Sequence, residues 1–241
     1  MATPSPSFSI VGLPGYPGAP GKAGTPGIAG QPGTNGTYDP KKKLCQPSSN
    51  GAVGHAGGDG SSGSSGGLGG NAPMFVLYVS TMTGTARILS QGGAGGDGGA
   101  GGGGGAGGAG GAAGENVNPQ ICLAGPNPCT FPASGGNGGS GGNGGAGGNG
   151  GNGGSGGDIY FYVGQDYKGG SLQPSSIGGP GGKDGEGGPG GAGGPGGNNE
   201  LAPPSTTPTT ALAGPAGSGG AVGQPGTPGA VGKFSIIQTP N

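Results

Sequence analysis

The sequence predicts a single domain without α-helix: a bundle of six antiparallel polyproline II or polyglycine II helices, with a small β-strand region at one end and proline-rich loops at the other. Glycine and proline supply 77 and 25 of the 241 residues, which leaves too few apolar side chains for a conventional core. Glycine also recurs at every third residue in six tracts of seven to nine glycines each. An exact period of this kind indicates a three-residue helix rather than a flexible linker.

The six tracts define the expected rods. A polyproline II rod has no internal hydrogen bonds, so its backbone N–H and C=O groups need partners on neighbouring rods. Gly-Gly-X triplets, repeated eight times from Gly135 to Asp158, remove side chains from two of three faces and allow that close approach. The X positions are expected to face solvent. We place the rods at approximately residues 12–36, 51–72, 92–114, 135–157, 178–198 and 214–232.

The composition of each tract predicts its place in the bundle. Tracts three, four and five are mainly Gly-Gly-X and suit the interior, whereas the first and last carry one glycine per triplet and several prolines. Proline donates no hydrogen bond, and side chains on two faces block a close neighbour, so these two tracts are expected at the edges. A collagen triple helix is the alternative for them; it pairs three chains instead of rods of one chain.

The connections between up-and-down rods alternate between the two ends of the bundle. One end collects residues 5–11, 73–91, 158–177 and 233–239, which are rich in β-branched and aromatic residues. We expect about six strands there, with residues 73–91 and 158–177 folded as β-hairpins. The other end collects the Pro-, Asn- and Thr-rich segments 37–50, 115–134 and 199–213, which are predicted as loops.

The strand end is also the predicted assembly site, because edge strands with unpaired N–H and C=O groups tend to pair with another chain. The candidate residues are Phe8 and Ile10 in the first strand and Phe234, Ile236 and Ile237 in the last. The alternative is that these two terminal strands pair with each other inside one subunit.

The loop end holds all three cysteines. Cys122 and Cys129 flank a turn-rich loop and form the candidate disulfide pair, which leaves Cys45 free, cross-linked to another chain or exchanged with one of the two. Asn35 opens an Asn-Gly-Thr sequon, a glycosylation site only in a chain that passes through a eukaryotic secretory pathway. The three lysines at 41–43 are expected in a solvated loop.

Composition and charge argue against several function classes. The single histidine, His55, is expected to be solvent-exposed, and no catalytic or metal-binding set can be assembled around it. With a net charge of −1 the chain offers no basic surface for nucleic acid, and the longest apolar run is too short to span a bilayer. We therefore expect no enzyme, cofactor, metal, nucleic acid or membrane span. The first residues show no secretory leader, which indicates a mature chain or another export route, such as a virus particle.

Repeats such as "GGNGGSGGNGGAGGNGG" resemble the glycine-rich receptor-binding domains of tail-fibre-tip adhesins in T-even-type phages, in which loops between rods contact the host. Six rods of Gly-X-X triplets more weakly resemble glycine-rich springtail antifreeze proteins, which also contain disulfides, and collagen-like proteins. These resemblances cover a little over half of the chain and imply the bundle architecture. A separate fibre-docking domain, expected for the adhesin, is not recognisable, and the long inserts exceed what a flat ice-binding face requires.

Three functions follow from these patterns. The preferred one is a non-enzymatic structural protein, a rigid glycine-rich subunit of an extracellular filament or virion fibre, which associates with itself. The second is a receptor-binding adhesin whose loops contact a cell-surface receptor. The third is an ice-binding protein that uses regularly spaced Ala or Asn side chains. All three place the protein at an extracellular surface or on a virion.

Overall fold

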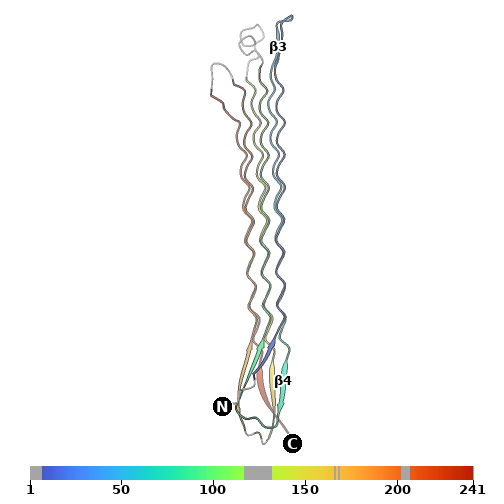
Figure 1. The fold of residues 1–241 in the computed structure, drawn as a ribbon, viewed down its shortest axis with the longest axis vertical. Coiled ribbons are helices and arrows are strands. Elements are labelled where there is room, and N and C mark those ends of the chain that lie inside the picture. The colour runs from blue at the N-terminus through green and yellow to red at the C-terminus, as the bar shows by residue number, and fades with distance from the viewer. Residues whose placement is uncertain (1–6, 117–131, 166, 168, 202–206, 241) are drawn as a thin grey trace.

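The molecule is a long, narrow rod in a computed structural model that describes residues 7–116, 132–165, 167, 169–201 and 207–240. Six glycine-rich segments run side by side along its length, and most of the strands gather at one end (Figure 1). We name these segments tracts 1 to 6 and keep for them the six residue ranges given above. The first and last strands of the chain lie at the same end of the rod.

The regular secondary structure consists of eight strands in three sheets. One three-stranded sheet has the order β1-β5-β7, another has the order β4-β6-β8, and β2 and β3 form a two-stranded sheet. The strands are β1 (Ser7–Val11), β2 (Thr37–Asp39), β3 (Leu44–Gln46), β4 (Phe75–Val79), β5 (Thr85–Gln91), β6 (Ile159–Gly164), β7 (Ser171–Ile177) and β8 (Phe234–Thr239).

The predicted fold class is wrong. We expected six polyproline II or polyglycine II helices with only a small strand region, but the described residues contain no helix, and no bundle of polyproline II helices is evident. The sheets are both parallel and antiparallel. The glycine tracts are extended segments without assigned secondary structure, and the backbone hydrogen bonds of their glycines run to other tracts.

The two expected hairpins are also wrong. β4 and β5 belong to different sheets, as do β6 and β7, and every pair of neighbours in the two three-stranded sheets is parallel. The physical reason is that each strand continues a tract. Strands that follow each other in the sequence continue tracts of opposite direction, so they cannot be neighbours in a parallel sheet.

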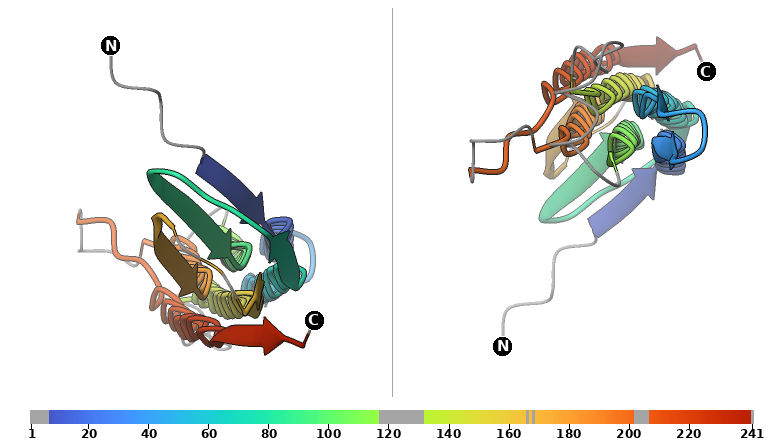
Figure 2. Two further views of the ribbon diagram at one scale, coloured as in Figure 1. Left: turned by 90° about the horizontal axis from the view of Figure 1, so that it is seen from below. Right: turned by 90° about the horizontal axis from the view of Figure 1, so that it is seen from above.

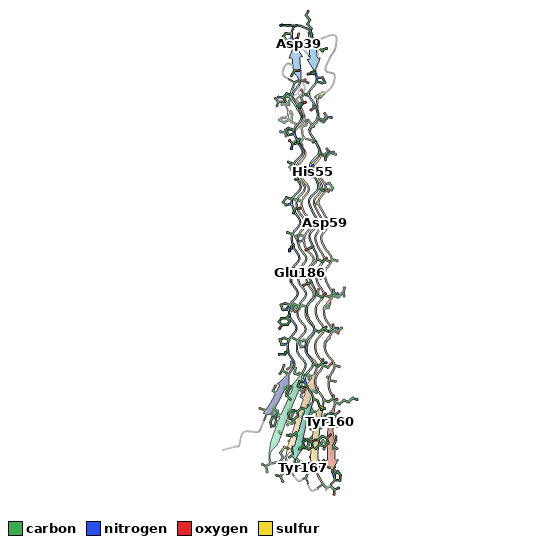
Figure 3. The ribbon with its side chains drawn as sticks, turned by 90° about the vertical axis from the view of Figure 1, so that its right-hand side faces the viewer. Asp39, His55, Asp59, Tyr160, Tyr167 and Glu186 are labelled. Carbon is green, nitrogen blue, oxygen red and sulfur yellow. The ribbon has the colours of Figure 1, made fainter. Side chains whose placement is uncertain are left out.

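Residues 37–50, predicted as a loop, contain the β2–β3 hairpin instead. Tyr38 pairs with Cys45 in its antiparallel ladder. One carboxylate oxygen of Asp39 accepts the backbone N–H groups of Lys41 and Lys42 at 2.9 and 3.2 Å, and Lys43 adopts a left-handed backbone with φ of 49°. Local side-chain capping therefore builds a tight turn at the far end of the rod (Figures 1 and 3).

The tracts form two layers that continue the two three-stranded sheets (Figure 2). Tracts 1, 3 and 5 extend from β1, β5 and β7, and tracts 2, 4 and 6 lead into β4, β6 and β8. Within a layer the neighbours are parallel; for example, the N–H of Gly144 in tract 4 donates to the carbonyl of Ser218 in tract 6 at 2.8 Å. Between layers they are antiparallel, as in the 2.8 Å bond from Gly185 in tract 5 to Gly148 in tract 4.

The hydrogen bonds place tracts 1, 3, 4 and 6 as their composition predicts, but tract 5, expected in the interior, bonds to only three neighbours and ends its layer. Tracts 3 and 4 bond to four neighbours each, whereas tracts 1 and 6 bond to two each. Tracts 1 and 6 therefore lie at opposite corners of the two-layer arrangement. The first glycine of each Gly-Gly pair in tract 3 donates to tract 5 and the second donates to tract 2, which explains why interior tracts need two glycines in three residues.

One register runs through strands and tracts alike. In the ladder between β6 and β8, Ile159 is paired with Phe234. The side chain of Asn143 in tract 4 bonds to Ser218 in tract 6 at the same sequence offset of 75 residues. An offset of 84 residues likewise links tract 2 to tract 4, and one of 86 links tract 3 to tract 5, matching β4–β6 and β5–β7. Strands and tracts thus belong to one continuous hydrogen-bonded layer.

Asparagine side chains at X positions are part of this layer, which corrects the expectation that they simply face solvent. The side-chain oxygen of Asn143 accepts the backbone N–H of Ser218 at 2.9 Å, and Asn149 caps Gln224 at 2.8 Å. Asn137 and Asn152 cap Leu212 and Thr227 in the same way. Ser140 lies at the same offset from Pro215, which has no N–H to cap.

Two serines join the sheets to the tracts. The Oγ of Ser90, fully buried in β5, accepts the N–H of Gly157 in tract 4 at 2.9 Å. The Oγ of Ser176 in β7 donates to the carbonyl of Gly157 and accepts the N–H of Gly232 in tract 6, both at 2.9 Å. These hydroxyls pair with backbone groups where the three-residue repeat of the tracts gives way to the two-residue alternation of the strands.

A methyl group at an interior glycine should destabilise the protein. A Cβ on Gly147 would collide with the backbone carbonyl of Gly185 in tract 5, and a small shift cannot relieve a clash with backbone. We expect Gly147→Ala to lower the free energy of unfolding by at least about 2 kcal/mol, because two or more backbone hydrogen bonds are lost at roughly 1 kcal/mol each. Chemical denaturation measures this change.

Gly103→Ala is the matched control. Gly103 occupies an X position of tract 3, where the nearest atom to an added Cβ is the Pro189 Cγ at 3.4 Å. This variant should be neutral or slightly stabilising, because alanine restricts the unfolded chain. Equal losses for the two variants would contradict the role assigned to the paired glycines.

A new asparagine cap should stabilise the protein where a free N–H stands opposite. Ala146 lies at the 75-residue offset from Ala221, so Ala146→Asn is expected to add one capping hydrogen bond and about 0.5 kcal/mol of stability. Ser140→Asn faces Pro215 and should add nothing. Denaturation midpoints of the two variants, measured together, check this; a gain from both or from neither contradicts it.

Candidate functional sites at the two ends

The strand end contains the only apolar core among the described residues. Sheets β1-β5-β7 and β4-β6-β8 face each other, and Ala86, Ile88, Ile159, Phe161 and Val163 are buried between them. Alternating burial along β6 shows that its odd-numbered residues point inward. The core is small, because each sheet contributes only one fully covered central strand.

The inner face of β8 is left uncovered. By their register with Ile159 and Phe161, Phe234 and Ile236 share the inner face of the sheet, yet they are 41% and 58% exposed, whereas Phe161 is 1% exposed. The opposite sheet ends at β7 and does not reach over β8. A hollow of about 340 Å³ opens beside them, lined also by Leu172 and Tyr167.

The predicted assembly residues fall on different surfaces. Phe8 is partly exposed and packs on Phe75 of the opposite sheet, with ring centroids 5.8 Å apart. Ile10 and Ile237 are half-buried, and Ile237 points to the outer face of its sheet, unlike Ile236. The terminal strands do not pair with each other, since β1 bonds to β5 and β8 bonds to β6. The alternative of internal pairing is therefore wrong.

The aromatic residues of this end divide between the two faces of one sheet. Phe161 lies inside, with Tyr167 against its edge at 6.0 Å between centroids. Tyr78 and Tyr162 stack at 4.7 Å on the outer face, where Tyr78 is largely exposed. Tyr160 and Tyr167 mark the strand end in Figure 3.

At the loop end, Glu200 connects three chain segments. Its carboxylate accepts the hydroxyl of Ser48 at 2.7 Å, the backbone N–H of Asn116 at 2.8 Å and the backbone N–H of Ala133 at 2.7 Å. These partners come from two of the connecting segments at this end, 37–50 and 115–134, and Glu200 itself belongs to the third, 199–213. Sequence reasoning missed Glu200, because nothing in its local sequence distinguishes it from a solvated carboxylate.

The pKa of Glu200 is lowered below its ordinary value. Partial burial acts to raise the pKa, but the hydrogen bonds from Ser48, Ala133 and Asn116 favour the charged form and outweigh burial. A depressed pKa in the folded state means that the ionised carboxylate stabilises the loop end above the ordinary pKa of a glutamate. That stability is lost as the pH falls below it.

The other residues singled out in the sequence have simple surroundings. Cys45 is disulfide-bonded, and the proposed pair Cys122 and Cys129 lies outside the described residues. Asn35 is exposed, and its side-chain oxygen accepts the N–H of Glu115 at 3.0 Å. His55 is exposed on tract 2 (Figure 3). All three lysines at 41–43 are exposed, as expected for a solvated turn.

Two kinds of feature are absent from the described part of the chain. No group of three or more His, Cys, Asp or Glu side chains is placed there to hold a metal ion. No helix in this part is long and apolar enough to cross a membrane.

Protonation of Glu200 should loosen the loop end. We expect the amide signals of Asn116 and Ala133 in nuclear magnetic resonance spectra to shift together as the pH falls from 7 to 3, and Glu200→Gln to remove this dependence. Glu186→Gln is the control, since it removes an exposed charge on the shaft of the rod (Figure 3). Unchanged titration in Glu200→Gln, or its loss in Glu186→Gln, would contradict the assignment.

No protein-family model and no curated protein sequence matches this chain. Among solved structures, the chain is similar to the springtail antifreeze protein from Granisotoma rainieri, a bundle of nine polyproline type II helices. The identity is 27%, over 88% of this chain and 93% of that chain, with a TM-score of 0.18. A TM-score this low carries no argument about function, and none of these comparisons supports the resemblance to phage fibre adhesins.

Proposed function

We propose that the protein is a non-enzymatic structural protein, a rigid subunit of an extracellular filament or virion fibre that associates through its strand end. The observation that carries this proposal is the uncovered inner face of β8, where Phe234 and Ile236 lie beside a hollow of mixed polarity. Single exposed apolar side chains also lie along the shaft, but at β8 two of them lie together on an open strand beside a hollow, which is typical of a contact surface.

The shaft supports end-to-end rather than side-by-side association. Interior tracts approach each other closely because glycine occupies both positions that face neighbours. Tract 1 instead carries exposed Leu13, Tyr16 and Ile28, and tract 6 carries exposed Val222 and Val231. Such side chains keep a seventh tract from another copy out of hydrogen-bonding range. Tracts 1 and 6 therefore resist side-by-side hydrogen bonding at one end of each layer, which favours assembly through the ends of the rod.

The rod itself suits a structural role. Its six tracts are cross-linked by backbone hydrogen bonds from end to end, and the register does not change along the shaft. Bending would have to break many of these bonds together. A stiff element of this kind holds its two ends at a fixed distance and in a fixed direction, which is what a filament subunit requires.

Self-association should depend on β8. We expect sedimentation velocity of the wild-type protein to show species larger than the 21.6 kDa chain as the concentration rises, and Ile236→Asp to return it to the monomer. A buried charge at the contact is unfavourable unless it is paired, which is the physical reason for this loss.

Val222→Asp is the control. Val222 is 59% exposed, nearly the same as Ile236, but lies on the shaft. This variant should associate like the wild type. A wild-type protein that remains monomeric at every concentration contradicts the proposed function, and equal effects of the two variants place the contact along the rod instead.

A further inference from the structure

We infer that the partner of β8 is the β8 strand of a second copy, paired antiparallel about a two-fold axis at Ile236. This inference rests on the proposed self-association and specifies its contact. It joins two copies at their strand ends into one continuous sheet, with the rods pointing in opposite directions. Because a two-fold contact closes at two copies, this contact makes a dimer, and a filament needs a second contact elsewhere on the rod.

The backbone groups available on the open side of β8 follow from its hydrogen bonds on the other side. The N–H of Ile159 in β6 donates to the carbonyl of Lys233 at 2.8 Å, so the backbone of Lys233 faces β6. Successive residues of a strand alternate in direction, so Ser235 and Ile237 also face β6. The N–H and C=O groups of Phe234, Ile236 and Gln238 therefore point away from the sheet, along its open edge.

These three residues are self-complementary. When Ile236 pairs with Ile236 of a second copy in an antiparallel arrangement, Phe234 stands opposite Gln238 of that copy, and Gln238 opposite its Phe234. In each of these pairs the N–H and C=O groups of one residue point at those of the other, so the two residues exchange two hydrogen bonds. This register satisfies every outward backbone group of the strand and brings the two exposed isoleucine side chains into contact.

The opposite sheet shows what a protected edge looks like. Ser171 in β7 donates to the carbonyl of Gly84 at 2.9 Å, and the carbonyl of Ile177 accepts the N–H of Gly92 at 3.0 Å, so odd-numbered residues face β5. Pro174 then falls on the open side, where its missing N–H blocks pairing. β8 contains neither proline nor a charged residue between Phe234 and Thr239.

The other two edge strands fit a partner less well. In β4 the N–H of Phe75 faces β6, bonded to Asp158 at 2.8 Å, which leaves only Val76 and Tyr78 pointing outward. In β1 the N–H of Gly12 faces tract 3, so the outward residues are Ser7, Ser9 and Val11. A two-fold at Ser9 would pair serines, with no apolar gain. β4 also exposes Tyr78 beside its open edge, but only β8 combines three outward residues with two uncovered apolar side chains on the inner face of its sheet.

The geometry allows a direct test by cross-linking. Hydrogen-bonded antiparallel partners have Cα atoms about 5.5 Å apart, within the range of a disulfide. Ile236→Cys should therefore give a disulfide-linked dimer under mild oxidation, seen on a non-reducing gel and removed by reductant. Phe234→Cys is the matched control, because the two copies of that residue are separated by about 14 Å in this register. The double variant Phe234→Cys, Gln238→Cys should cross-link again.

A proline in β8, placed as Pro174 is placed in β7, provides a second test. Ile236→Pro removes one outward N–H and leaves the ladder to β6 intact, so it should fold normally, with a wild-type circular dichroism spectrum, and lose association at least tenfold. The wild-type chain, which carries only its native cysteines, sets the background for the cross-linking.

The outcomes separate this inference from the proposed function. Cross-linking of Ile236→Cys and of the double variant, but not of Phe234→Cys, supports the register. Equal cross-linking of Phe234→Cys, or cross-linking of Ser9→Cys in place of Ile236→Cys, overturns it, even if sedimentation shows that the wild-type protein associates. A wild-type protein that never associates overturns the proposed function together with this contact.

Discussion

The structure depends on one requirement: each glycine N–H inside the rod must find a carbonyl on another tract. Because a tract makes no such bonds with itself, no tract is stable alone, and the bundle forms only when all six lie in register. Glycine is needed wherever two tracts meet, since a Cβ there would strike backbone, as at Gly147. The many ordered glycines carry a large entropic cost that this dense hydrogen bonding must offset.

The same requirement explains how the molecule is bounded. Prolines and larger side chains at tracts 1 and 6 bound one side of each layer, and asparagines such as Asn143 use their side chains to satisfy backbone groups that remain at the surface. The chain places its few buried large apolar residues at the strand end, where two small sheets close around Phe161. β8 extends past that cover, and the proposed assembly through this strand rests on that observation.

Sequence periodicity was sufficient to find the tracts, their alternation and the two edge tracts, because glycine spacing reports directly on close packing. It could not show which tracts share a layer, and the hairpin expectation for residues 73–91 and 158–177 failed for that reason. The predicted helical fold class was wrong because a three-residue glycine period shows which positions pack closely but does not determine the secondary structure of the tracts. The caps made by Asn137 to Asn152 were visible only once the 75-residue offset was known. The role of Glu200 could not be predicted, because its partners lie in other loops whose relative positions the sequence does not show.

The shared register of the six tracts is tested most directly by scalar couplings across individual hydrogen bonds, detected by nuclear magnetic resonance in protein labelled with ¹⁵N and ¹³C. We expect a coupling from the amide nitrogen of Gly144 to the carbonyl carbon of Ser218, and another from Gly185 to Gly148. Together these two define the parallel register within a layer and the antiparallel register between layers. Couplings displaced by one triplet, or none in the glycine tracts, would contradict the shared register on which the fold and the proposed assembly surface depend.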